Sequence, residues 1–250
     1  MGEISFLKET QKLIERLEKQ EENINKAANK AAKCIQSSNW VQLFGSGHSV
    51  IPTMDCFPRY GGFVGFNPIM DPRLMWTTVS GPGGAEELIW LERQEEYMDI
   101  FMRHQTWNKD DILIVVSHGG QNAAPVEMAL SAKEAGLYVI AITSEENDKN
   151  KPATHSSNKK IGDIADLNIY NEVTSEDAVV SVPNVAGKVG GLSTLSAITI
   201  IQSLVSETAV KLAEMDYYVT PFASPNADGV EEGRNEKVYD EFRSRLKNKR

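Results

Sequence analysis

Two short polar segments contain the residues that could bind a ligand or move a proton. The first loop, residues 46–49, lies in "FGSGHS", and the second loop, residues 117–122, reads "SHGGQN". Each follows an apolar, strand-like run and leads into a helical pattern. Glycine lets the backbone approach a ligand closely, and the start of a helix offers unpaired N–H groups at the positive end of its dipole. Both loops are therefore suited to bind an anion.

The side chains of the two loops add further hydrogen-bond donors. Ser46, Ser49 and Ser117 carry hydroxyl groups, and Asn122 carries an amide. In an open parallel sheet, ligands bind outside the carboxyl ends of the strands, where the strand order reverses. We expect the two loops to lie side by side at such a point and to bind one anionic group together.

Other ligands fit the first loop less well. A dinucleotide-binding Gly-x-Gly-x-x-Gly motif would need a third glycine where Val50 stands, and an acidic residue about 20 positions later is not evident. The Gly-Lys-Ser/Thr of a triphosphate-binding loop is absent. A purely structural turn stays open as an alternative, because Gly and Ser are common in turns. The repetition of the same chemistry in two loops favours the phosphate of a small organic ligand.

The elements that must position these loops predict a doubly wound α/β fold. The expected strands cover residues 40–44, 62–66, 111–116, 138–143 and 166–171. Between the third and fourth, a helical pattern begins with Pro125 and ends with Gly136, as helices often do. A strand, a helix and a strand at this spacing predict a right-handed parallel crossover. The sequence therefore predicts a five-stranded parallel sheet flanked by helices.

Further helices are expected before, between and after these strands. They cover residues 4–37, 86–104, 190–215 and 236–250. No change in composition divides the chain, so residues 1–250 are predicted to form a single domain. Within it, residues 1–37 form an N-terminal helix that packs on the domain or on a partner subunit. Residues 236–250 form a polar C-terminal helix or tail.

The overall composition excludes several classes of protein. The 250 residues carry a formal net charge of −9, which argues against a nucleic-acid surface. No apolar run approaches the ~20 residues of a membrane span, and the N-terminus lacks the apolar core of a signal peptide. Four scattered histidines and two cysteines offer no metal-binding pattern. We expect a cytoplasmic protein with no metal, cofactor, nucleic-acid or membrane partner.

Five segments resemble the sugar isomerase (SIS) domain in order along the chain. They read "FGSGHS", "VVSHGGQNAAPVEMALSAKEAGLYVIAITS", "HSSNKKIGDIADLNIYN", "DAVV" and "KVGGLSTLSAI". More narrowly, they resemble stand-alone bacterial SIS proteins labelled as phosphosugar isomerases. The resemblance implies a five-stranded parallel sheet that binds a phosphosugar in Ser/Thr-rich loops. It also implies a homodimer or homotetramer with shared sites.

The resemblance also implies three groups of substrate contacts. They are Ser46, Gly47, His48 and Ser49 in the first loop, Ser117, His118, Gly119, Gly120, Gln121 and Asn122 in the second, and Ser193 and Thr194 after paired glycines.

The chain departs from the pattern of the family at three places. The second loop has Gly119 where relatives commonly have a second serine, so the phosphate would depend more on backbone N–H groups or Asn122. Relatives tend to carry a glutamate on the helix after the first loop, where Asp55 is the nearest carboxylate here. Some relatives use a C-terminal histidine, but this chain has none after His155. The departures concern the reaction more than the fold.

Aldose–ketose isomerisation needs a base that moves a proton between adjacent carbons and a group that polarises the carbonyl. The candidate catalytic residues are His48, Asp55 and His118, while Glu87 and Glu92 are typical of solvated helix residues. Two alternatives stay open: a lyase or etherase that acts on a phosphorylated sugar, and a phosphosugar-binding regulator without chemistry. The sequence does not name the sugar, and a sulfonate or carboxylate would suit the same donors.

Overall fold

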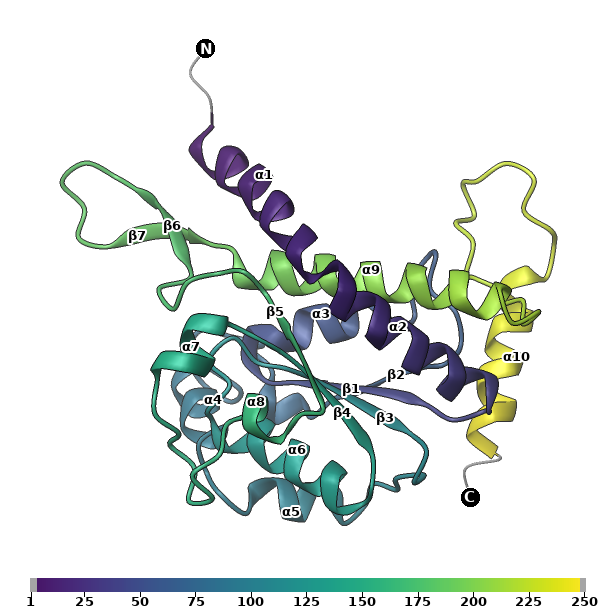
Figure 1. Cartoon of the computed structure of the whole chain (residues 1–250), viewed down its shortest axis with the longest axis horizontal. Coiled ribbons are helices and arrows are strands. Elements are labelled where there is room, and N and C mark those ends of the chain that lie inside the picture. Colours follow the sequence, from purple (N-terminus) through teal and green to yellow (C-terminus); the bar gives the residue numbers. More distant parts are fainter. Residues whose placement is uncertain (1–3, 248–250) are drawn as a thin grey trace.

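A five-stranded parallel sheet forms the centre of the computed structural model, which describes residues 4–247 (Figure 1). Its strand order is β2-β1-β3-β4-β5, so the order reverses between β1 and β3. The strands are β1 Val41–Gly45, β2 Phe66–Ile69, β3 Ile112–Val116, β4 Tyr138–Thr143 and β5 Leu167–Tyr170. Residue Gly45 pairs with Val116, so β1 and β3 end side by side. The predicted fold class is confirmed, and the two loops leave the sheet at its switch point.

Helices cover both faces of the sheet because successive strand side chains point to opposite faces. In β3, Ile112 and Ile114 join the core under one layer of helices, whereas Leu113 and Val115 join the core on the other side. The first layer contains α2 Glu21–Gln36, α3 Val50–Met54 and α9 Ser193–Ala213 (Figure 1). The second layer contains α4 Ala85–Leu91, α5 Tyr97–Met102, α6 Ala123–Glu134 and α8 Ile161–Ile164.

Three elements differ from the sequence prediction. The second strand begins at Phe66, and Gly65 before it packs so closely on Ile35 that a Cβ there would lie 2.6 Å from the Cδ1 atom of Ile35. The helix expected over 86–104 is broken into α4 and α5, since Glu96 has a left-handed φ of 70°. The N-terminal helix is α1 Ser5–Leu17 followed by α2, with a 3-10 turn over Glu18–Gln20 between them.

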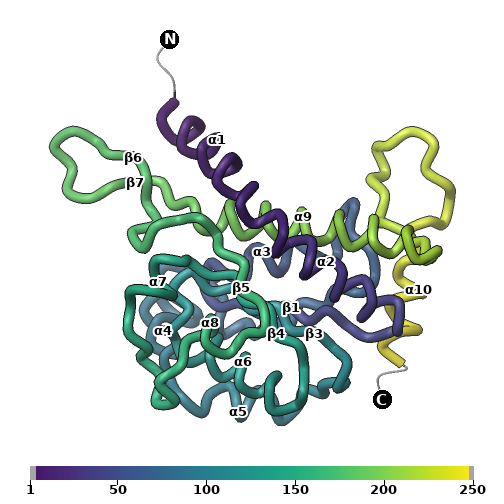
Figure 2. Tube along the Cα trace, in the orientation of Figure 1, coloured from purple at the N-terminus to yellow at the C-terminus, as the bar shows by residue number. Residues whose placement is uncertain are grey.

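A hairpin that the sequence did not predict precedes α9. It consists of β6 Ala178–Ser181 and β7 Lys188–Gly191, and it projects from the body of the molecule beside α1. Figure 2 shows the hairpin and α10 (Arg234–Lys247) near opposite ends of α9. The hairpin therefore borders the end of the sheet that carries the two loops, whereas α10 lies far from it.

The long helix α9 packs inside the fold. Within the described range of the chain it is the one helix with the length and apolar character to span a membrane. It contacts α2 and α3, and its residues Ile200, Ile201 and Leu204 are buried in the core.

The C-terminal helix α10 is fixed to the body by Arg245, which is only 8% exposed. Its guanidinium donates hydrogen bonds to the carbonyls of Ile35 and Asn39 at 3.1 Å and to the hydroxyl of Tyr217 at 3.2 Å. It also lies over the ring of Trp40, 5.5 Å from the centroid. A charged side chain thus satisfies carbonyls at the end of α2.

Replacing Arg245 with Met is expected to lower the free energy of unfolding by about 2–4 kcal/mol, because a buried carbonyl and a partly buried one lose a charged donor. Arg243→Met is the matched control, since Arg243 is exposed and pairs with Asp240 on the same helix. Thermal and urea denaturation followed by circular dichroism measure the difference. Equal stability of the two variants would contradict the role of Arg245.

Candidate functional site

The first loop turns sharply at the end of β1. A Cβ at Gly45 would lie 2.3 Å from the carbonyl oxygen of Ser49, so the chain must fold back over a residue without a side chain. Gly47 has a positive φ of 58°, which also favours glycine. The turn continues through Gly47–Ser49 into α3. The sequence motif is therefore explained by the backbone geometry of this loop.

The second loop is held by its own hydroxyl and by β4. The Oγ of Ser117 accepts a hydrogen bond from the N–H of Gly120 at 3.1 Å. Gly120 has a φ of 69°, and a Cβ there would lie 2.9 Å from Oγ1 of Thr143. Asn122 then precedes the first residue of α6. The hydroxyl of Ser117 thus serves the turn, whereas the sequence prediction assigned it to the substrate.

Glu92, the residue after α4, joins the two loops. Its Oε2 accepts a hydrogen bond from Oγ of Ser46, and its Oε1 accepts one from Nδ2 of Asn122, both at 2.7 Å. Burial raises the pKa of the Glu92 carboxyl, and the hydrogen bond from Ser46 opposes this shift. The sequence prediction of a solvated glutamate is wrong. The side chains of Ser46 and Asn122, which the resemblance assigns to the substrate, donate hydrogen bonds to this carboxylate.

A cavity of about 510 Å³ opens at the carboxyl ends of the strands, and we call it the strand-end cavity. It is lined by His48, Ser49, Pro52, Val116, His118, Ile142, Asn171, Asp177, Gly191, Ser193, Thr194 and Ala197. The structure thus brings together five of the predicted site residues, from both loops and from the start of α9. They are His48, Ser49, His118, Ser193 and Thr194.

The other predicted loop residues are not among those that line the strand-end cavity. Ser46, Gly47, Ser117, Gly119 and Gly120 form the turns of the two loops. Gln121 and Asn122 line a smaller hollow of about 310 Å³, together with residues that include Arg93 and His155.

His118 lines the cavity as a neutral imidazole. The amide oxygen of Asn171 accepts a hydrogen bond from the N–H of Val173, so its Nδ2 faces Nδ1 of His118 at 3.0 Å. Since Nδ1 accepts this hydrogen bond, the ring hydrogen lies on Nε2. Burial lowers the pKa of His118, and the Nε2 atom, which is itself buried, has no hydrogen-bond partner among the described residues. The hydrogen on Nε2 is therefore a buried donor that the folded chain leaves unpaired beside the cavity.

Asp177 supplies a carboxylate that sequence reasoning missed. It lies before β6 with a left-handed φ of 63°, and its Oδ1 accepts hydrogen bonds from the N–H groups of Leu192 at 3.0 Å and Ser193 at 2.7 Å. It therefore stabilises the start of α9 from a distant loop. The "DAVV" segment was noted as part of the resemblance, but nothing in its spacing placed it beside α9. Among the described residues that line the cavity, Asp177 is the one with a carboxylate side chain.

His48 is exposed and packs against an aromatic residue from the segment between β2 and α4. Its ring lies edge-on to that of Trp76, with the ring centroids 4.1 Å apart. The indole of Trp76 also lies near Gly47. Trp76 is 44% exposed and borders the first loop.

Asp55, the predicted carboxylate base, lies away from the strand-end cavity. Its oxygens accept hydrogen bonds from Nη1 of Arg59 at 2.6 Å and from Nε2 of Gln202 at 2.8 Å. It lines a separate hollow with Tyr60 and Phe222. The structure therefore does not bring Asp55 together with His48 and His118.

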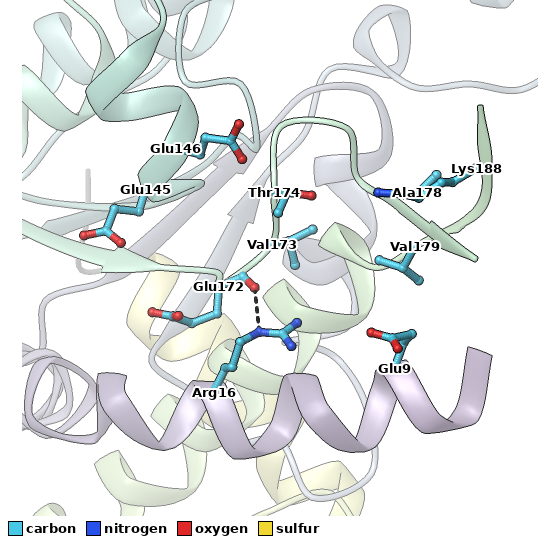
Figure 3. A pocket seen from close by; sticks show the side chains of 10 residues that line it. All are labelled: Glu9, Arg16, Glu145, Glu146, Glu172, Val173, Thr174, Ala178, Val179 and Lys188. Carbon is cyan, nitrogen blue, oxygen red and sulfur yellow. Dashed lines mark hydrogen bonds between the residues drawn. The ribbon is translucent and has the colours of Figure 1, made fainter. Parts of the chain in front are cut away.

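A further hollow of about 430 Å³ lies between α1, the hairpin and the end of β5 (Figure 3). Four of its lining residues are Glu9, Glu145, Glu146 and Glu172. Arg16 donates a hydrogen bond from Nε to the carbonyl of Glu172 at 3.2 Å, as Figure 3 shows. None of the predicted site residues lines this hollow, in which Arg16 and Lys188 accompany the four glutamates.

Within residues 4–247, no cluster of three or more His, Cys, Asp and Glu side chains is arranged to hold a metal ion. Cys34 and Cys56 are both buried and free of disulfide bonds.

Comparison with known proteins assigns the chain to a family. The model of the SIS domain matches residues 5–144. A UPF0309 protein of Halalkalibacterium halodurans is 36% identical over 230 residues, which cover 92% of this chain and 90% of that protein. A UPF0309 protein of Geobacillus kaustophilus is 35% identical over 240 residues, which cover 94% and 93% of the two chains.

A solved structure that is similar to this chain is the sugar isomerase domain of an RpiR transcription factor from Sphaerobacter thermophilus. It is 15% identical, covers 92% of this chain and 97% of that chain, and has a TM-score of 0.39. The assignment rests on the family model and on the two UPF0309 relatives. The chain therefore belongs to the SIS-domain family and to the UPF0309 proteins.

Proposed function

We propose that this protein binds a phosphosugar in the strand-end cavity and interconverts its aldose and ketose forms by proton transfer. The observation that carries the proposal is that His48 and Ser49 of the first loop line the same cavity as the His118 imidazole of the second loop and the Asp177 carboxylate. Membership of the SIS family supports a phosphosugar as the ligand.

The hydroxyl of Ser49 and the side chain of His48 bind the phosphate in this proposal. Both residues line the cavity, and β1, which precedes them, pairs with β3, which precedes the second loop. Like charges repel, so the phosphate end of the ligand points toward the first loop and the carbonyl end toward α9. The hydroxyls of Ser193 and Thr194 then bind sugar hydroxyl groups.

Asp177 and His118 carry out the proton transfer. The Asp177 carboxylate removes the proton from the carbon next to the carbonyl and returns it to the former carbonyl carbon. His118 donates a hydrogen bond from Nε2 to the carbonyl oxygen and stabilises the negative charge that develops there. This assignment replaces Asp55, the base predicted from the sequence, with a carboxylate that lines the cavity.

A panel of aldose and ketose phosphates in deuterated water tests the proposal. We expect deuterium at the carbon next to the carbonyl, detected by NMR, together with the isomeric sugar. We also expect ligand at 100 times its dissociation constant to stabilise the fold by about 2.7 kcal/mol, measured as a thermal shift. The unphosphorylated sugars serve as the control.

Two other outcomes identify the alternative functions. Stabilisation by sugar phosphates without any exchange would show a binding module and exclude the isomerase. Loss of a substituent from a phosphorylated sugar would show a lyase or etherase, since elimination begins with the same proton removal. If neither binding nor exchange were detected, the proposal as a whole would be overturned. The predicted cytoplasmic location and homo-oligomeric state belong to the same proposal.

A further inference from the structure

The separation of the two loops determines whether both can contact one ligand. They leave different strands, and the residues between them in the sequence include β2, α4 and α5. Backbone pairing fixes β1 and β3 only as far as Gly45 and Val116. Beyond these residues, backbone hydrogen bonds hold the second loop to Ile142, Ser144 and Ile161, and side-chain contacts connect the two loops to each other.

Three hydrogen bonds that Glu92 accepts provide contacts of this kind. The carboxylate of Glu92 binds Ser46 in the first loop and Asn122 in the second, each at 2.7 Å. Its backbone carbonyl accepts a hydrogen bond from the N–H of Ala124 in the first turn of α6 at 3.0 Å. Glu92 thus contacts the first loop, the second loop and the helix that follows the second loop.

Glu92 is itself held firmly in place. Its N–H donates to the carbonyl of Leu88 at 2.9 Å, and Leu88 is only 1% exposed. Glu92 is not among the residues that line the strand-end cavity, and neither are its partners Ser46 and Asn122. The carboxylate therefore contacts the loops from outside the space that the ligand would occupy.

We infer that Glu92 is a positioning residue that holds the two loops at the separation needed to bind a phosphosugar. The inference deepens the proposed function and rests on it. It also explains why two of the predicted phosphate donors, Ser46 and Asn122, do not face the cavity: their hydrogen bonds connect the loops through Glu92.

A comparison of the variants Glu92→Ala and Glu92→Gln distinguishes a positioning role from a role as a competitor of the phosphate or as a reacting base. Alanine removes both side-chain hydrogen bonds. Glutamine can keep both, because its Oε1 accepts from Ser46 and its Nε2 donates to the amide oxygen of Asn122 once that amide has rotated. The control is Glu86→Ala, because Glu86 is exposed on the same short helix.

Hydrogen–deuterium exchange of the ligand-free protein gives the first readout. In Glu92→Ala, the backbone amides of residues 46–50 and 118–124 should exchange about 10- to 100-fold faster, as expected when two hydrogen bonds to a charged group are lost. Strands β3 and β4 should stay protected. Glu92→Gln should restore protection of both loops, and Glu86→Ala should match the unmodified protein. Unchanged exchange in Glu92→Ala would overturn the inference even if no sugar phosphate binds at all.

Affinity for inorganic phosphate and for the sugar phosphates of the panel gives the second readout. We expect Glu92→Ala to bind at least about tenfold more weakly and Glu92→Gln to retain binding. Tighter binding by Glu92→Ala would identify the carboxylate as a competitor of the phosphate. Normal binding with loss of deuterium exchange into substrate in Glu92→Gln would identify it as a reacting base. Either result would overturn a positioning role.

Discussion

Asp177→Asn is expected to lower the rate of deuterium incorporation into a bound phosphosugar by about 10²- to 10⁴-fold, the usual contribution of a positioned general base. The amide cannot accept the proton that the carboxylate removes. The affinity for the sugar phosphate should change little, since Asp177 is placed at the carbonyl end of the ligand. Initial rates of exchange by NMR and affinities by calorimetry measure the two effects separately.

The stability of this variant should stay close to that of the unmodified protein. The Oδ1 of asparagine can still accept the hydrogen bonds from Leu192 and Ser193, and asparagine is as good as aspartate at a helix start. The left-handed φ of 63° also suits asparagine. Asp177→Ala also removes the hydrogen-bond acceptor at the start of α9, so this variant should lower the free energy of unfolding by about 1 kcal/mol.

The neighbouring Glu176→Gln is the matched control, because Glu176 is partly exposed and pairs with Lys188 across the hairpin. It should leave exchange and binding unchanged. If the Asp177→Asn variant incorporates deuterium into the sugar phosphate at the normal rate, Asp177 only stabilises α9. His48 or His118 must then be the base.

The sequence predicted the sheet well because the pattern of buried strands is local. β3 and β4 are almost wholly apolar, as expected for strands covered on both faces, and the helix between them has clear ends. The adjacency of the two loops followed from this topology. The shifted second strand and the broken helix after it depend on tertiary contacts, such as that between Gly65 and Ile35.

The direction of the loop side chains could not be predicted in the same way. A serine in a glycine-rich loop can face the ligand or the scaffold, and the choice at Ser46 depends on Glu92, which lies 46 positions away. A solvated glutamate and a buried one look alike in a charged helical segment. Asp177 depends on a hairpin of mixed pattern, so only the folded chain places it beside α9.

Gly45→Ala is expected to lower the free energy of unfolding by about 3 kcal/mol, because the new methyl group would lie 2.3 Å from the carbonyl oxygen of Ser49. The contact is with backbone, so the whole first loop must move rather than one flexible side chain. For a chain of this size, the loss corresponds to a decrease in Tm of about 6–12 °C.

The same displacement should abolish ligand binding, since it moves Ser49 and His48 away from the second loop. Gly119→Ala is the matched control: a Cβ at Gly119 meets nothing within 4 Å, and its φ is not in the left-handed region. That variant should stay within about 0.5 kcal/mol of the unmodified protein. Thermal denaturation with and without a sugar phosphate distinguishes the two glycines. A normal Tm for Gly45→Ala would mean that the first loop can bind a ligand without this tight turn.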